Sequence, residues 1–178
     1  MVIITNYRLD EQGGFFYVKT SETSTCPVCV AFLTVRGLRQ RVLIFEDGDI
    51  DKKEKLMIRR LFCSECNRIH HELPDCIVPY KRHCANTIIK LIERNPGKVS
   101  QNTADDYTPC GRDTVRRILS WWYAVAPYLA ETYKTLMEKL NKPYDTKPSF
   151  KALVRAACNS SNWIFAKSIS TRSATMSG

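Results

Sequence analysis

The chain has 178 residues, which is enough for one or two small domains and too few for most multidomain enzymes. Its 44% hydrophobic and 25% charged residues lie near globular averages and exclude a chain that is disordered throughout. Lysine and arginine outnumber aspartate and glutamate by 27 to 18, and this net charge of +9 favours a polyanionic partner, nucleic acid before membrane.

The positive charge is concentrated in the second half of the sequence. Residues 1–84 carry 13 basic and 11 acidic side chains, whereas residues 85–178 carry 14 basic and 7 acidic ones. We therefore expect the polyanion-binding surface mainly in the second half. No run of about 18 apolar residues is present, which predicts no membrane-spanning helix. The first residues lack the pattern of a signal peptide, so we expect a cytoplasmic protein.

The first 80 residues have the composition of β-strands. Aromatic and β-branched residues follow the Gly13-Gly14 turn, and a second β-rich stretch surrounds Gly37 as in a hairpin. A charged loop then leads to an apolar stretch that ends at a cysteine pair. The predicted segments are a strand over 15–18, a hairpin of 30–35 and 40–45, a loop over 46–53 and a strand over 56–62.

From Tyr80 the apolar residues recur at helical spacing. This spacing predicts helices over about 83–94, 100–107 and 111–126, the last ended or kinked by Pro127, and then further helical segments to residue 158. Trp122 fits the apolar stripe of the third helix, so Trp121 is expected to pack against C-terminal helices or a partner. The predicted fold class is α+β, with a β-rich zinc ribbon followed by an all-α helix-turn-helix and a helical extension. The corresponding domains are 1–79, 80–126 and 127–167, with a flexible tail over 168–178.

Two CxxC pairs, Cys26-Pro-Val-Cys29 and Cys63-Ser-Glu-Cys66, carry the most specific signal in the sequence. A two-residue gap lets a tight turn aim both sulfurs at one ion, and two such zinc knuckles make a four-thiolate Zn²⁺ site. Asn67 suits the left-handed conformation that often follows a knuckle, whereas Val30 stands where glycine is more usual. The alternatives are a redox CxxC pair and a structural disulfide, but neither pair has the strand–helix context of a thioredoxin-like site. The sequence predicts one structural zinc ion per chain.

The remaining thiols and histidines are expected to lie outside the metal shell. Four thiolates close a tetrahedral shell, so His70 and His71 are expected to be solvent-side residues or to support the ligands from behind. The irregularly spaced cysteines are expected to be unpaired small hydrophobic residues in the core. They are Cys76, Cys84, Cys110 and Cys158.

The predicted helix-turn-helix offers a DNA-binding surface on its third helix. Polar residues there lie off the apolar stripe and can reach phosphates or guanine edges, aided by basic residues of the ribbon. The alternative is an ordinary amphipathic helix with a solvated face, and the acids Asp105 and Asp106 in the second helix would have to face away from DNA. The candidate DNA-binding residues are Arg112, Thr114, Arg116 and Arg117 on the helix, with Arg39, Arg41 and Lys81 on the ribbon.

The order of these motifs resembles that of a known group of proteins. A CPxC knuckle, the Ile58-Arg-Arg-Leu-Phe-Cys-Ser-Glu-Cys66 segment, the Ile69-His-His-Glu-Leu-Pro74 string and the basic Tyr80-Lys-Arg82 segment follow one another. Over about residues 24–165 the chain resembles short uncharacterised bacterial proteins, and it is similar to the N-terminal DNA-binding region of insertion-sequence transposases. The resemblance implies a zinc ribbon, a helix-turn-helix with Cys110 in its core, and duplex DNA as the ligand.

The sequence shows no motif for catalysis. The acids after the third helix, Glu131, Glu138 and Asp145, lie within 15 residues of one another and cannot build the RNase-H-like site of a transposase. We therefore expect a non-enzymatic, sequence-specific DNA-binding protein of the bacterial nucleoid. It would act as an accessory or regulatory factor of a mobile element, in concert with a separately encoded transposase or recombinase. The alternatives are a zinc-ribbon adaptor that docks on a recombinase or RNA polymerase, and an inactive, truncated transposase.

Overall fold

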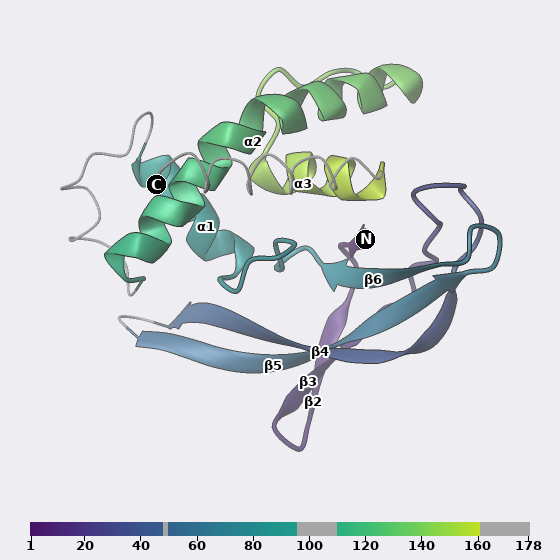
Figure 1. Ribbon diagram of the computed structural model, residues 1–178, viewed down its shortest axis with the longest axis horizontal. Helices are drawn as coiled ribbons and strands as arrows, with labels where there is room; N and C mark the ends of the chain where they lie inside the picture. Colours follow the sequence, from purple (N-terminus) through teal and green to yellow (C-terminus); the bar gives the residue numbers. More distant parts are fainter. Residues whose placement is uncertain (48–49, 96–109, 161–178) are drawn as a thin grey trace.

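The structure of the protein is a computed structural model, and it describes residues 1–47, 50–95 and 110–160. Six strands form one curled sheet and three helices gather on one side of it (Figure 1). The strands are β1 (Val2–Ile4), β2 (Arg8–Gln12), β3 (Phe15–Lys19), β4 (Thr34–Asp47), β5 (Ile50–Cys63) and β6 (Arg68–Pro74). The helices are α1 (Ala85–Arg94), α2 (Arg112–Lys139) and α3 (Phe150–Asn159).

The long β4–β5 hairpin is the backbone of the sheet. The two strands have 14 residues each and pair without interruption from Thr34–Phe62 to Asp47–Ile50, apart from a bulge between Val35 and Gly37. The predicted hairpin around Gly37 is therefore wrong. Gly37 has a φ of 153°, and the bulge takes up this conformation inside a continuing strand instead of reversing the chain. The chain reverses between Asp47 and Ile50, inside the segment expected to be a loop.

The other edge of β5 is shared by two strands. β3 runs parallel to β5 through Phe16–Leu56 and Tyr17–Met57. It follows the Gly13-Gly14 turn, as predicted, and pairs antiparallel with β2, which precedes that turn. β6 pairs antiparallel with the last four residues of β5, and β1 lies parallel to β6. The sheet order is thus β1-β6-β5-β3-β2, with β4 on the opposite side of β5.

The strands and helices share one hydrophobic core. Residues of β1, β4 and β5 pack with residues of all three helices in a single cluster, and α3 also contacts β1, where Asn159 Oδ1 accepts a hydrogen bond from the backbone N–H of Ile3 at 2.9 Å. Among the described helices, none is long and apolar enough to cross a membrane. The most deeply buried members of the core include Ile4, Leu43, Leu56, Ile58, Ile88, Leu119, Leu129 and Ala157.

The predicted fold class, a zinc ribbon followed by a separate all-α helix-turn-helix, is wrong. The protein is β-rich, its strands extend from the N-terminus to Pro74, and α1 and α2 cover the sheet instead of forming a domain of their own. α2 continues for 28 residues through Pro127 without a break, because its buried residues continue at helical spacing from Val115 to Thr132. Burial of this continuous face outweighs the cost of about 3 kcal/mol for a proline inside a helix. The expected helix over 100–107 and the tail over 168–178 lie outside the described residues.

The two adjacent tryptophans of α2 lie opposite to expectation, because Trp121 and not Trp122 is in the core, and Trp122 and not Trp121 packs on the C-terminal helix. Trp121 is buried and lies beneath Lys81, whose Nζ is 4.2 Å from the ring centroid. Trp122 is partly buried and packs on Phe150 of α3, with ring centroids 5.1 Å apart. Trp121 thus joins α2 to the segment that follows β6, and Trp122 joins it to α3.

Candidate metal centre and basic cluster

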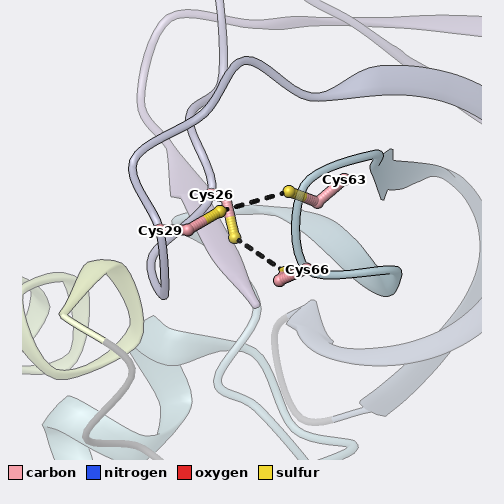
Figure 2. Close-up of side chains that lie close together, drawn as sticks. All are labelled: Cys26, Cys29, Cys63 and Cys66. Carbon is pink, nitrogen blue, oxygen red and sulfur yellow. Dashed lines mark hydrogen bonds between the residues drawn. The ribbon is translucent and has the colours of Figure 1, made fainter.

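The four cysteines of the CxxC pairs lie together, as the sequence predicts. Figure 2 shows the two pairs facing each other, with Cys26 and Cys29 in the loop before β4, Cys63 at the end of β5 and Cys66 in the turn that follows. The Sγ atoms are 3.6 Å apart between Cys26 and Cys66 and 3.3 Å apart between Cys29 and Cys63. All four lie within 4.8 Å of one another. They form a site that can hold a metal ion.

Local backbone geometry explains why each pair points inward. In the first knuckle the N–H of Val30 donates to Cys26 O, and the N–H of Val28 lies 3.4 Å from Cys26 Sγ. Val30 is thereby held at a φ of 65°, the left-handed region that glycine would occupy without strain. In the second knuckle Asn67 takes the same region, at a φ of 54°, and the chain turns directly into β6. The conformation expected for Asn67 is confirmed.

The dimensions and chemistry of the site fit a tetrahedral ion. A zinc–sulfur bond of about 2.3 Å places the sulfurs of a Zn²⁺ tetrathiolate roughly 3.8 Å apart. The Sγ separations of 3.3 and 3.6 Å lie slightly below that value, and all four sulfurs lie within 4.8 Å of one another. Four sulfur donors and no oxygen donor favour a soft or borderline ion over Mg²⁺ or Ca²⁺.

The thiols strongly perturb one another. The backbone N–H of Cys66 lowers the pKa of Cys63 to about 7, whereas burial and the neighbouring thiols raise the pKa of Cys66 to about 12. Four thiolates at this separation repel one another, so the fully deprotonated set requires a cation at its centre. The arrangement is therefore suited to binding a metal ion.

Two residues of β6 hold the first knuckle in place through hydrogen bonds to Cys26 and Ser24. His70 is buried, and its Nε2 lies 3.4 Å from Cys26 Sγ, where an N–H can donate to a thiolate. Glu72 is fully buried; it accepts hydrogen bonds from Arg59 Nε at 2.5 Å, Arg59 Nη2 at 2.8 Å and Ser24 Oγ at 2.7 Å. Ser24 lies two residues before Cys26. His70 thus contacts a candidate metal ligand, which is one of the two positions expected for it. Glu72 holds the same knuckle through Ser24, and the sequence did not reveal this role.

The scattered cysteines lie apart from this cluster. Cys84, Cys110 and Cys158 are buried and Cys76 is half-buried, and none of the eight cysteines forms a disulfide. Burial raises the pKa of Cys158 to about 12, which keeps it a neutral thiol. Cys110 Sγ lies 3.3 Å from His83 Nδ1, just before the start of α2. These thiols pack in the core, as small hydrophobic residues do.

Four of the seven predicted DNA-binding residues come together at one place. The guanidinium of Arg41 donates to Lys81 O at 3.3 Å, and Arg39 on the same face of β4 lies 3.3 Å from His71 Nε2. Arg117 of α2 lies close enough to Lys81 to lower its pKa. We call Arg39, Arg41, Lys81, Arg82 and Arg117 the basic cluster; Arg82 joins it because its charge, like that of Arg39, lowers the pKa of Arg41.

The basic cluster holds its charges close together at an electrostatic cost. Burial is the larger cause of the low pKa of Lys81, about 8, and of the lowered pKa of Arg41, and neighbouring positive charges add to both effects. Within residues 1–47, 50–95 and 110–160, no member of the cluster forms an ion pair with an acidic side chain. An anion bound here would relieve that cost.

The other three predicted residues lie on the first turns of α2. Thr114 Oγ1 accepts a hydrogen bond from Arg117 Nη2 at 3.4 Å, so it orients a member of the cluster. Arg112 and Arg116 are exposed. Sequence reasoning did not single out Arg82 as a site residue, although it adjoins Lys81. Four of the five cluster residues lie within residues 1–84, the half of the chain with the smaller net charge.

Comparisons with known proteins give one finding. A search of curated proteins and a search of solved structures returned no match. A family model, described as a domain of unknown function (DUF6431), matches residues 26–118. This region is just over half of the 178 residues and contains both CxxC pairs and the whole basic cluster. The chain therefore belongs to the DUF6431 family.

Proposed function

We propose that the protein is a zinc-stabilised DNA-binding protein that contacts the phosphates of the duplex through the basic cluster. The observation that carries the proposal is the convergence of five cations from β4, the segment before α1, and α2, without an acidic partner among the described residues. A protein that holds like charges together in this way gains free energy when a polyanion binds. The net charge of +9 acts in the same direction.

The zinc ion has a structural role in this proposal. One Zn²⁺ held by Cys26, Cys29, Cys63 and Cys66 joins the loop before β4 to the β5–β6 turn. It thereby fixes the start of β4, the strand that carries Arg39 and Arg41. With four thiolates the shell is closed, so the ion stabilises the fold and supplies no open position for catalysis.

The resemblance to insertion-sequence transposases supports duplex DNA as the polyanion. We propose a non-catalytic accessory or regulatory factor of a mobile element, which binds its DNA site specifically and works with a separately encoded transposase or recombinase. Arg112 and Arg116, exposed beside Arg117 on α2, extend the contact surface beyond the basic cluster. They are the candidates for contacts with base edges, and the members of the cluster are the candidates for contacts with phosphates.

The test is a salt series with labelled duplex DNA from the region beside the gene. For the zinc-loaded protein, log K should fall with log salt by about 0.9 for each phosphate contacted. The variant Arg39→Gln/Arg41→Gln/Arg117→Gln should bind all sequences more weakly and show a slope that is flatter by about 2–3. Arg8→Gln/Lys19→Gln/Lys139→Gln removes three exposed charges elsewhere and serves as the matched control. Equal slopes for the two triple variants would refute the proposal.

An adaptor that binds a protein partner is the second candidate, and the surface of the first knuckle favours it. Val30 and Phe32 are 75% and 73% exposed, and Val28 beside them is also exposed. Exposed apolar side chains that gather in this way are typical of surfaces that bind other proteins. An adaptor would bind DNA weakly, with a shallow salt slope that the triple variant leaves unchanged.

A further inference from the structure

A groove between α2 and α3 is used neither by the metal centre nor by the basic cluster. It has a volume of about 510 Å³ and lies at the C-terminal half of α2, whereas Arg117 lies in the first turns of that helix. The groove exists because α3 presents the small side chains of Ala152 and Ala156 to Tyr133, Leu136 and Met137 of α2. Its volume lies within the range of about 300–1,000 Å³ that is usual for sites of small organic ligands.

The polar residues of the groove give one end of it a positive charge. Asp75 is already engaged, because it accepts hydrogen bonds from Lys151 Nζ and Tyr7 Oη at 3.2 Å each. Arg155 projects from the same helix one turn beyond Lys151, and within the described chain its guanidinium makes no ion pair and no hydrogen bond. Glu22 interacts electrostatically with Arg155, and its Oε1 accepts hydrogen bonds from the backbone N–H groups of Thr5 and Asn6.

We propose that this groove binds a small organic monoanion, with its apolar body against the α2 side chains and its anionic head at Arg155. An apolar wall with a net charge of one positive unit selects a ligand that has a single carboxylate, sulfonate or phosphodiester on a hydrocarbon or aromatic body. Lys142, Lys151 and Arg155 bring three positive charges to the groove, and Asp75 and Glu22 offset two of them. A dianion would therefore exceed the one positive charge that remains. The proposal is independent of DNA binding, because it uses no residue of the basic cluster.

The experiment compares two probes that differ only by one sulfonate group. Anilinonaphthalenesulfonate is a monoanion that fluoresces in apolar surroundings, and N-phenylnaphthylamine is the same body without the sulfonate. Both are titrated into the zinc-loaded full chain, with octanoate as a non-fluorescent competitor. The variants are Ala152→Leu, which fills the groove, and Arg155→Gln, which removes the cation. Lys134→Gln, which removes an exposed charge from another face of α2, is the control.

The expected pattern distinguishes the groove from other apolar surfaces. The sulfonate should bind the wild type at one saturable site, and octanoate should displace it. Ala152→Leu should abolish this binding, and Lys134→Gln should leave it unchanged. Arg155→Gln should weaken the sulfonate by about two- to fivefold, as a partly exposed charge contact does, and leave the neutral probe unaffected. Unchanged sulfonate affinity in Ala152→Leu, or equal changes for both probes in Arg155→Gln, would overturn the proposal. If Ala152→Leu fails to fold, the comparison of the two probes on Arg155→Gln decides.

Discussion

The buried carboxylate of Glu72 gives the sharpest test of how the first knuckle is held. Glu72 accepts two hydrogen bonds from Arg59 and one from Ser24, and the Ser24 backbone O in turn accepts the N–H of Leu33 on the far side of the knuckle. β5, β6 and the chain on both sides of Cys26 therefore meet at one carboxylate. The informative substitution is Glu72→Met, which keeps the length of the side chain and removes the charge and both carboxylate oxygens.

The expected loss of stability follows from the burial of the pair. Removal of one partner from a buried ion pair costs about 3–5 kcal/mol, because the remaining charge stays buried without compensation. The Arg59 side chain is 23% exposed, so water recovers part of its solvation and the lower end of that range applies. We expect about 3 kcal/mol, with the unsatisfied Ser24 hydroxyl included. For a chain of this length that corresponds to a fall in Tm of about 6–12 °C.

A double-mutant cycle separates the pair from simple loss of packing. Arg59→Met, Glu72→Met and the combined variant are unfolded in urea with excess zinc, and unfolding is followed by circular dichroism. The combined variant should be more stable than Glu72→Met, because it leaves no buried charge alone. Two results would contradict the role given to this pair. One is a loss of unfolding free energy in the combined variant that equals the sum of the two single losses, and the other is a loss below about 1 kcal/mol for Glu72→Met.

Three further predictions concern the knuckles and the basic cluster. Cys63→Ser should reduce the zinc content, measured by atomic emission, from one ion per chain to a small fraction, while Cys110→Val should leave it unchanged. Val30→Gly should raise the free energy of unfolding by about 1 kcal/mol, because the φ of 65° strains a β-branched residue and suits glycine. Duplex affinity should fall between pH 7 and 9, because the pKa of Lys81 is about 8 and the neutral amine no longer attracts phosphate. Lys81→Arg should remove this pH dependence, and the same fall in both proteins would assign it to another group.

The ligand set could be predicted from sequence because the signal is local. A CxxC pair and its turn are contained in a few residues, and only two such pairs exist, so the four ligands could be named without knowledge of the fold. The same holds for Asn67, since its conformation is set within its own turn. The parts of the metal centre that could not be predicted depend on contacts between distant residues. In the sequence, Glu72 looks like any exposed residue of a strand. Its role becomes visible only when the fold places Arg59, 13 positions earlier, beside it.

The helical half shows where periodicity alone is insufficient. An apolar stripe at helical spacing is the same whether the helix packs in a helix-turn-helix or on the face of a sheet. Pro127 suggested a boundary, but a proline reports only its local cost, and the burial that overrides it at Val125 and Leu129 comes from the sheet and the other helices. The basic cluster has the same character. Arg39 and Arg41 share a face because a strand has a period of two, whereas their meeting with Lys81 and Arg117 depends on how α2 crosses the sheet.

The position of β1 has a consequence for synthesis of the protein on the ribosome. Residues 2–4 leave the ribosome long before their partners, because they pair with residues 72–74 of β6, and the side chain that binds the Ile3 amide belongs to residue 159. At about 5–20 residues per second, the N-terminal strand waits roughly 4–14 s for β6 and about 8–30 s for α3. During the second interval β6 can close the sheet with only three residue pairs of β1 to protect its edge. Nascent chains on one messenger RNA are therefore exposed to strand exchange at this edge until α3 emerges and secures β1.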